Sequence, residues 1–268
     1  MLVHDRYNAP VAEKVLRSTA GTVARLRAAG CVFAEEEAAL LVEAAAGDPA
    51  ALESTTVRRE AGEPLEAILG WAELGGLRIR LLPGVFVPRQ RSLLLAELAV
   101  AREPRTLLDL GCGSGALAAV VRDRVPGAEV WAADADLIAV ACARLNLPAD
   151  RVLESDLFEG LPSGLRGSFD VILAHLPYVP HDRIALMPRE ARDHEPHTAL
   201  DGGHDGLDLQ RRAVAEAPRW LAPGGAVVLA SSDAQAPVTA SLLEDAGLTA
   251  SVHRDEERDA TAVVGVRS

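Results

Sequence analysis

The sequence predicts an α/β protein with a seven-stranded, mainly parallel sheet, preceded by a small helical domain and a β-hairpin. Segments with helical and strand patterns alternate from Arg89 to the C-terminus, which is typical of a sheet with helices on both faces. Residues 1–70 carry only helical patterns. A Gly-Gly pair, Gly75–Gly76, separates two short segments. In the second, apolar residues alternate with arginines over 77–81, which is typical of a β-hairpin.

The domain expected over residues 1–70 is helical. Apolar residues recur at a spacing of three to four over 11–29, which favours a helix. A second helix is expected over 35–46, where three glutamates precede strong helix formers. A third is expected over 49–61, and a short helical turn over 65–69.

Residues 71–88 are expected to form a hairpin linker, and residues 89–268 the second domain. The first helix of that domain is expected over 92–101, with Ser92 as its cap. The last two strands follow each other without a helix, so one of them is expected to run antiparallel to the rest. The expected strands are 106–110, 129–133, 151–154, 170–174, 226–230, 248–253 and 260–266, and the further helices are 116–125, 137–146, 210–220 and 238–246.

Composition excludes several classes of protein. The chain has 268 residues, of which 49% are hydrophobic and 25% charged, so it can bury a core and is not disordered. The formal net charge of −12 disfavours broad binding to DNA or to an anionic membrane. No apolar run approaches a membrane span, residues 1–10 lack an apolar signal core, and three dispersed cysteines suit a reducing compartment. We therefore expect a cytoplasmic protein.

The strongest local signal is the segment LLDLGCGSG, in which a predicted strand ends in glycines that open a helix. Gly111, Gly113 and Gly115 permit a tight turn and a close approach of the backbone to a ligand. Their GxGxG spacing differs from the GxGxxG of dinucleotide sites, which disfavours a nicotinamide dehydrogenase. Asp134 ends the next strand, where an acid binds ribose hydroxyls. With Asp109 before the glycines, the segment resembles the S-adenosylmethionine motif of class I methyltransferases, in which such an acid lies near the methionine ammonium.

A second signal is HLPYVP, which begins at His175 directly after the fourth predicted strand. In an open parallel sheet, ligands bind beyond the carboxyl ends of the strands, and the first and fourth strands flank the switch point. This segment should therefore face the methyl donor. Asp156 follows the third strand. In proteins of this type that position lies near the adenine amino group, although an exposed loop aspartate without a ligand is an equal alternative.

The chain resembles the PrmC/HemK-like family of protein-(glutamine-N5) methyltransferases, and is most similar to an actinobacterial subgroup of unnamed acceptor. The resemblance covers nearly the whole chain from Glu63 and rests on PLEAILGWAELGGLRIRLLPGVFVPR, LLDLGCGSG, AADAD, SDLFEGLP, LPYVP and MPREARDHEPHTALDGGHDGLDLQRR. It implies a Rossmann-like class I fold with S-adenosylmethionine as donor and S-adenosylhomocysteine as product. It also implies N5-methylation of a glutamine in a peptide-chain release factor, docked by the N-terminal helical domain.

One departure from the family concerns the acceptor motif. The family reads Asn-Pro-Pro-Tyr or Asn-Ala-Pro-Tyr, and this chain reads His175-Leu176-Pro177-Tyr178. In the family, the Asn oxygen and a following carbonyl accept hydrogen bonds from the acceptor amide, and the Tyr packs on that amide. A neutral imidazole offers one acceptor nitrogen with a different reach. Three alternatives stay open: retained glutamine methylation, a different acceptor (a small molecule or another side chain) with His175 as base or orienting group, or a donor-binding paralogue with a degenerate site.

The oligomeric state cannot be predicted from the sequence. The expected site residues fall into three groups: catalytic, donor-binding and substrate-binding. No metal is expected, because the HxxH pair of His194 and His197 lacks the spacing of a helical zinc site and no Cys joins it. The expected catalytic residues are His175, Leu176, Pro177 and Tyr178. The expected donor-binding residues are Asp109, Gly111, Cys112, Gly113, Gly115, Asp134, Ala135, Asp156, Leu157 and His175. The expected substrate-binding residues are Arg89, Arg91 and Tyr178, the two arginines because the resemblance places their segment in the pocket wall, with a solvated pair as the alternative.

Overall fold

The computed structural model describes residues 9–268, with side chains described from residue 19 onward apart from that of Arg189. The expectation about residues 1–10 therefore lies mostly outside the described residues. The chain forms two compact units, each described by itself below. One comprises the residues up to Gly70 together with Arg189–His194, and the other comprises Trp71–Pro188 and Glu195–Ser268.

The first unit is helical, and α1 to α4 lie close to the expected ranges, whereas the short helix α8 was not predicted. Its buried core consists of four small and apolar side chains from the first two helices, with Leu52, Leu65 and Ile68 packed against them. The third helix begins with Pro49 and is capped by the Asp48 carboxylate, which accepts a hydrogen bond of 2.9 Å from the Ala50 N–H. The helices are α1 (Ala9–Ala28), α2 (Ala34–Ala44), α3 (Pro49–Glu60), α4 (Leu65–Leu69) and α8 (Arg189–His194).

The second unit opens with the expected hairpin. Strands β1 (Trp71–Leu74) and β2 (Leu77–Arg80) pair antiparallel around Gly75 and Gly76. Both glycines have positive φ angles, of 61° and 86°, which other residues adopt only with strain.

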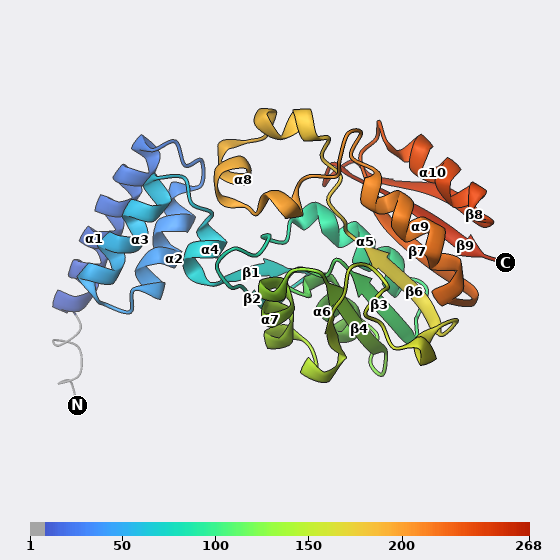
Figure 1. Ribbon diagram of the computed structural model, residues 1–268. Coiled ribbons are helices and arrows are strands. Elements are labelled where there is room, and N and C mark those ends of the chain that lie inside the picture. Colours follow the sequence, from blue (N-terminus) through green and yellow to red (C-terminus); the bar gives the residue numbers. More distant parts are fainter. Residues whose placement is uncertain (1–8) are drawn as a thin grey trace. The chain divides into compact units, whose positions relative to one another are not determined.

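A seven-stranded sheet in the order β5-β4-β3-β6-β7-β9-β8 forms the centre of this unit (Figure 1). β9 runs antiparallel to both of its neighbours, and all other pairs are parallel, which confirms the predicted sheet with one antiparallel strand. The strands are β3 (Thr106–Leu110), β4 (Glu129–Asp134), β5 (Val152–Glu154), β6 (Phe169–Ala174), β7 (Leu221–Ser231), β8 (Leu248–Asp255) and β9 (Ala260–Arg267).

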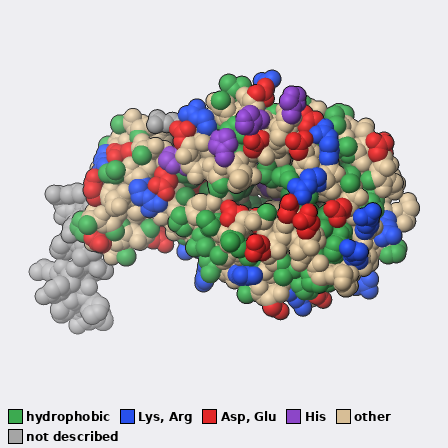
Figure 2. Space-filling view, in the orientation of Figure 1, with side chains coloured by type: hydrophobic (Ala, Val, Ile, Leu, Met, Phe, Trp, Pro, Cys, Tyr) green, Lys and Arg blue, Asp and Glu red, His purple; other side chains and the backbone are tan. Residues whose placement is uncertain are grey.

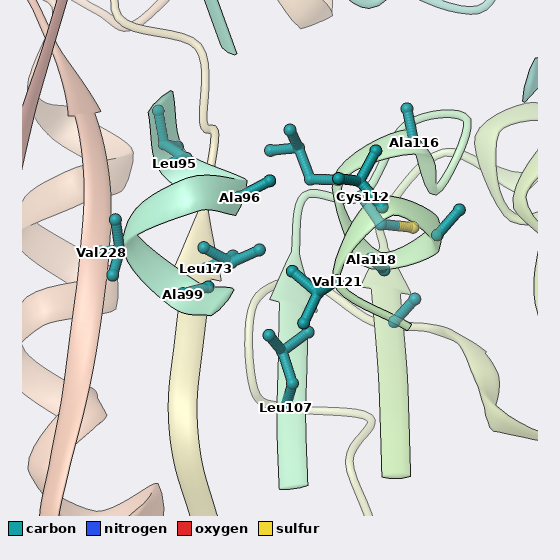
Figure 3. Packing of buried hydrophobic residues seen from close by; sticks show 14 of the residues in the cluster. Leu95, Ala96, Ala99, Leu107, Cys112, Ala116, Ala118, Val121, Leu173 and Val228 are labelled. Atoms are coloured by element: carbon teal, nitrogen blue, oxygen red, sulfur yellow. The ribbon is translucent and has the colours of Figure 1, made fainter. Parts of the chain in front are cut away.

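Helices cover both faces of the sheet because the strands are apolar on both sides. In β3, Leu107 belongs to the core cluster under α5, α6 and α7, whereas Leu108 belongs to the cluster under α9 and α10. Figure 3 shows α5 crossing the sheet, with Ala96 and Ala99 lying near Leu173 of β6. The α-helices are α5 (Leu93–Val100), α6 (Ala116–Arg124), α7 (Leu137–Asn146), α9 (Asp208–Trp220) and α10 (Ala236–Asp245), and the short 3-10 helices are Gln90–Ser92, Ala149–Arg151, Ser163–Leu165, His181–Leu186 and His197–Ala199.

Two local predictions were wrong. The Ser92 side chain does not cap α5: it is the last residue of a 3-10 turn with helical dihedrals, and its side chain makes no capping hydrogen bond. β7 begins at Leu221 rather than Ala226, because Leu221 already pairs with Phe169 and a register irregularity follows that pair.

In the described part of the chain, no helix is both long and apolar enough to cross a membrane.

Candidate active site

The glycine loop between β3 and α6 lies close against other segments of the second unit. Gly111, Gly113 and Gly115 have φ angles of 71°, 54° and 75°. A β-carbon at Gly111 would lie 2.8 Å from Leu176 Cδ2, and one at Gly115 would lie 2.7 Å from Leu147 Cδ1. At Gly113 a β-carbon would meet no described atom within 4 Å. Two of the glycines therefore permit close packing, and the third borders open space where a ligand can approach the backbone.

Asp109 is a buried carboxylate, 1% exposed, and it is the second-last residue of β3, just before this loop. Its Oδ2 accepts a hydrogen bond of 3.2 Å from the Ala118 N–H at the start of α6. Its Oδ1 is buried and has no hydrogen-bond partner among the described residues. Burial raises the pKa of Asp109 to about 7. A buried carboxylate with a spare oxygen fits a cationic ligand such as an ammonium group, which would stabilise its charge.

Asp134 ends β4 and joins that strand to the glycine loop. Its Oδ2 accepts a hydrogen bond of 2.8 Å from the Gly113 N–H, and its Oδ1 accepts one of 2.9 Å from the Asp136 N–H. Burial raises the pKa of Asp134, and these two bonds oppose the rise. The side chain stays partly exposed and each carboxylate oxygen can accept a second bond, so it can still bind hydroxyl groups. The next residue, Ala135, is exposed.

Cys112 contributes its backbone to the loop, since its N–H donates to the Ala133 carbonyl at 3.0 Å and its thiol is buried. Asp156 lies just beyond β5, half-exposed, and forms an ion pair of 2.8 Å with Arg212 of α9. An exposed pair of this kind contributes little to stability, so Asp156 can exchange it for a ligand. Leu157 is buried and has a positive φ of 51°.

The acceptor motif directly follows β6. Leu176 is buried against Gly111, as described above. The His175 ring stands edge-on to Phe86, at 5.9 Å and 88°, and nearly parallel to Tyr178, at 6.1 Å and 28°. Protein atoms surround His175 although part of its surface stays accessible, and this burial together with the charge of Arg91 lowers its pKa to about 4. His175 is therefore a neutral imidazole near pH 7.

The loop that follows the motif is held by backbone contacts. The Tyr178 carbonyl accepts a hydrogen bond of 2.9 Å from Gln235 Nε2, which also donates to the Asp205 carbonyl at 3.0 Å. The Val179 N–H donates to the Leu200 carbonyl at 3.1 Å. A β-carbon at Gly206 would lie 2.3 Å from the Tyr178 carbonyl oxygen, so only glycine fits there. These contacts fix the backbone of Tyr178, and Pro177 lies between it and Leu176.

The two arginines expected to bind substrate differ in their surroundings. Arg89 forms an ion pair with Glu195, whose side chain is 2% exposed, and its guanidinium lies 5.7 Å from the centre of the Phe86 ring. Arg91 instead lines a cavity of about 350 Å³ beside His175 and Tyr178. Arg89 thus contacts Phe86 and Glu195, and Arg91 lies beside a ligand-sized space; the substrate-binding role expected of both stays a prediction.

Most of that cavity wall was missed by sequence reasoning. Ser92 ends the 3-10 helix before α5, Leu95 lies in the first turn of α5, and Ser231 pairs with Thr261 where β7 meets β9. Phe86, which contacts His175, was also missed. No local motif marks these positions, because strand pairing brings them together from distant parts of the sequence. The cavity is lined by Arg91, Ser92, Leu95, His175, Tyr178, Val179, Ala230, Ser231, Ser232, Asp233, Asp259, Ala260 and Thr261.

Among the described residues, no group of three or more His, Cys, Asp or Glu side chains could hold a metal ion. On the side that Figure 2 shows, Lys and Arg side chains lie among Asp and Glu side chains, and no continuous basic face is visible over the described residues.

The fold and the glycine loop define a class I methyltransferase. A family model described as "Methyltransferase small domain" matches residues 76–187. The T. thermophilus 16S rRNA methyltransferase RsmC, solved with AdoMet and guanosine, is similar with a TM-score of 0.53 and 25% identity over 74% of this chain and 50% of that one. A methyltransferase from Pyrococcus furiosus has a TM-score of 0.55 and 19% identity, covering 81% of this chain and 98% of that one.

The family follows from sequence relatives. A release factor glutamine methyltransferase of Bradyrhizobium diazoefficiens is 34% identical over 92% of this chain and 91% of its own length. One of Deinococcus radiodurans is 40% identical over 74% of this chain and 72% of its own length. The chain belongs to the release factor glutamine methyltransferase family, as the resemblance predicted. Its expected place in an actinobacterial subgroup stays a prediction.

Proposed function

We propose that this protein methylates the side-chain amide nitrogen of a glutamine in a peptide-chain release factor, with S-adenosylmethionine as donor. The observation that carries the proposal is the contact of Leu176 with Gly111, which holds the acceptor motif against the glycine loop. When the donor and acceptor sites are in contact, a methyl group can pass directly from the bound donor to the bound acceptor. The names of the relatives support glutamine as the acceptor.

The residues of the loop fit the donor. Bound S-adenosylmethionine supplies an electrophilic methyl group on a sulfonium. The spare, buried Oδ1 of Asp109 suits its ammonium group, and the open face of Gly113 allows it to approach the backbone. Asp134 would accept hydrogen bonds from the ribose hydroxyls. Asp156 would lie near the adenine amino group, as the family resemblance implies, and Ala135 and Leu157 are further expected donor-binding residues.

The acceptor motif would act by orientation. An amide nitrogen is a weak nucleophile, so its alignment with the methyl group decides the rate. A neutral His175 ring nitrogen can accept a hydrogen bond from one amide N–H, and the Leu176 carbonyl can accept the other. The Tyr178 ring, nearly parallel to His175, would pack on the planar amide.

The low pKa of His175 weighs against a role as general base. A base with a pKa of about 4 takes a proton poorly at neutral pH, and an efficient one has a pKa near the working pH. This favours the orienting role over a redirected acceptor that needs deprotonation. The ordered Tyr178 backbone and the adjoining cavity weigh against a degenerate site.

A release factor as substrate implies a cytoplasmic enzyme, since translation ends there. We also propose that the N-terminal helical unit docks this protein partner, because it exposes the apolar side chains of Val32 and Phe33 in the turn before α2 and of Val57 in α3.

The test is transfer of labelled methyl groups. The purified protein is incubated with methyl-tritiated S-adenosylmethionine and the release factor of the same organism, with an unrelated protein of similar size as acceptor control. The proposal expects label in the release factor alone. Calorimetry with S-adenosylhomocysteine, and with NADH as a control ligand, is run in parallel. Binding of S-adenosylhomocysteine without any labelled release factor would overturn the assigned acceptor, and no binding in a folded sample would overturn the donor site.

A further inference from the structure

Three segments of the second unit meet at the side-chain amide of Gln235. This residue directly precedes α10, in the turn that follows β7. Its Nε2 donates to the Tyr178 carbonyl at 2.9 Å and to the Asp205 carbonyl at 3.0 Å. An amide nitrogen carries two hydrogens, so both are used. One side chain therefore holds both the acceptor motif and the loop before α9.

Ser232 sets the orientation of this amide. Its hydroxyl donates to Gln235 Oε1 at 2.7 Å, and its backbone carbonyl accepts the Gln235 N–H at 3.1 Å and the Ala236 N–H at 2.9 Å. Because the amide oxygen faces the Ser232 hydroxyl, the amide nitrogen faces the two carbonyls. The side chain of Gln235 is thus held by hydrogen bonds at both its oxygen and its nitrogen.

Gly206 allows the amide to reach the backbone of Tyr178. Its φ angle is 81°, and a β-carbon there would overlap both the Tyr178 carbonyl oxygen and Gln235 Nε2. The next carbonyl along the chain, that of Val179, accepts a hydrogen bond of 2.9 Å from the Gly202 N–H. The hydrogen bond between Gln235 and Tyr178 therefore lies in a tightly packed part of the loop, where only glycine fits beside it.

The Tyr178 ring depends on this backbone for its place. The side chain is half-buried, and its ring lies nearly parallel to the His175 ring, at 6.1 Å and 28°. The backbone sets the direction in which the side chain leaves the chain, so a shift of the Tyr178 carbonyl also moves the ring. The rate of a transfer between two bound molecules depends on their alignment, and a surface on which the acceptor lies contributes to that alignment.

We propose that Gln235 is a positioning residue for the methyl transfer. Through the Tyr178 carbonyl it holds the Tyr178 ring where an acceptor amide can lie against it. The proposal rests on the proposed function, because it takes the acceptor to be an amide packed on Tyr178. Gln235 exerts this role through Tyr178 and not by contact with the reacting atoms.

The first test follows the Tyr178 ring directly. The chain has two tyrosines, Tyr7 and Tyr178, so labelling with fluorotyrosine gives fluorine NMR signals from these two residues alone, and Tyr178→Phe assigns them. Gln235→Met keeps a side chain of similar length without the amide. We expect it to shift or broaden the Tyr178 signal, while S-adenosylhomocysteine binds with unchanged affinity. A Tyr178 signal that is the same in Gln235→Met and in the unmodified protein would overturn the proposal.

The second test measures methylation of the release factor. Gln235→Met should lower kcat at saturating donor and acceptor by at least about tenfold, since a misplacement of about 1 Å can lower a rate by about 100-fold. The matched control is Gln210→Met, because Gln210 is also an amide bound to a carbonyl: it donates to Ala230 at 2.8 Å and accepts from the Thr239 hydroxyl at 2.9 Å. This control should lower the melting temperature but keep kcat and the Tyr178 signal.

Two kinetic outcomes would contradict the proposal. Equal losses of kcat in Gln235→Met and Gln210→Met would show a general loss of stability. An unchanged kcat in Gln235→Met, despite a displaced Tyr178 signal, would show that the position of the ring does not matter for the reaction.

Ser232→Ala is a milder variant of the same device. It removes the hydroxyl that orients the amide and leaves the backbone hydrogen bonds of the turn in place. We expect it to move the Tyr178 signal in the same direction as Gln235→Met and to lower kcat by a smaller factor. If Gln235→Met does not fold, an unchanged Tyr178 signal in Ser232→Ala overturns the proposal.

The positioning role and the proposed function fail separately. If the unmodified protein binds S-adenosylhomocysteine but does not methylate a release factor, the proposed substrate is rejected. The fluorine signal then still decides whether Gln235 sets the position of Tyr178. Methylation of the release factor with the same kcat in Gln235→Met would reject the positioning role alone.

Discussion

The side chain of Leu176 lies against the α-carbon of Gly111, so closely that a β-carbon there would come within 2.8 Å of Leu176 Cδ2. Gly111 begins the loop after β3, and Leu176 is the second residue after β6, the neighbouring strand in the sheet. The contact therefore joins the proposed donor loop to the acceptor motif at the carboxyl ends of two adjacent strands. We expect this contact to set the distance between a bound donor and a bound acceptor.

Substitution of Gly111 by Ala tests the contact. The new methyl group must push Leu176 away, and the φ angle of 71° adds strain. A displacement of about 1 Å can lower a rate by about 100-fold, so we expect kcat/KM to fall by about that factor. Gly127→Ala is the matched control, because Gly127 has a φ of 93° with no described atom within 4 Å of a β-carbon. It should lose only about 1–2 kcal/mol of stability and keep its kcat. Equal losses of activity in the two variants would contradict the importance of the contact.

Asp109→Asn tests the cation site. The amide keeps an oxygen for the Ala118 N–H but carries no charge for an ammonium group. We expect S-adenosylhomocysteine to bind at least about tenfold more weakly by calorimetry. In the unmodified protein, affinity should rise about tenfold from pH 6 to pH 8, because binding needs the ionised form of a group whose pKa is about 7. The Asn variant should show no such rise, and a slope that survives the substitution would contradict the assignment.

The stability of the ligand-free protein should show the opposite trend. Asp109 holds its proton more tightly in the folded protein, with a pKa of about 7, than in the unfolded chain, where it is near 4. Between these values the folded state binds more protons, so this group lowers stability as the pH rises through that range. Asp109→Asn should therefore raise the melting temperature more at pH 8 than at pH 5. Thermal unfolding at the two pH values measures the difference.

His175 should act without a change of protonation. Because its pKa is about 4, kcat at saturating donor should stay flat between pH 6 and pH 8. His175→Ala should lower kcat by about 100-fold with unchanged binding of S-adenosylhomocysteine, by analogy with the loss of one orienting hydrogen bond. His175→Asn should retain most activity, since its side-chain oxygen can accept the same bond. An inflection in kcat near pH 6.5 that disappears in His175→Asn would instead identify a base.

Arg89 should stabilise the folded protein through Glu195 and should help to position the Phe86 ring. Its loss removes the Arg89 guanidinium from the buried Glu195 carboxylate and removes the cation beside Phe86. We expect Arg89→Gln to lose about 2 kcal/mol, because a hydrogen bond to a charged group contributes about 1.5–3 kcal/mol. The exposed pair of Arg105 with Asp170 is the control, and Arg105→Gln should lose less than about 1 kcal/mol. Urea unfolding of both variants checks the contrast.

The strand–turn–helix segment around Gly111 could be predicted from the sequence, whereas most of the cavity wall could not, for a physical reason. The residues around Gly111 lie in one continuous strand–turn–helix segment, so the spacing of the glycines in the sequence already indicates the shape of the loop. The alternation of helix and strand patterns likewise predicted the order of elements and the antiparallel β9. The wall formed by Ser92, Ser231 and Thr261 depends on which strands pair in space, and no local pattern encodes that pairing. Ser92 was predicted as a helix cap because its residue type favours that role, yet its backbone is already helical.

The most direct test of the account is the position of the methyl group in the product. The release factor is incubated with the protein and S-adenosylmethionine, digested, and mapped by tandem mass spectrometry, with the His175→Ala variant as control. The account predicts one added methyl group on the side-chain amide of a single glutamine, strongly reduced with the variant. A methyl group on any other residue, or an unmodified release factor in the presence of a protein that binds S-adenosylhomocysteine, would contradict it.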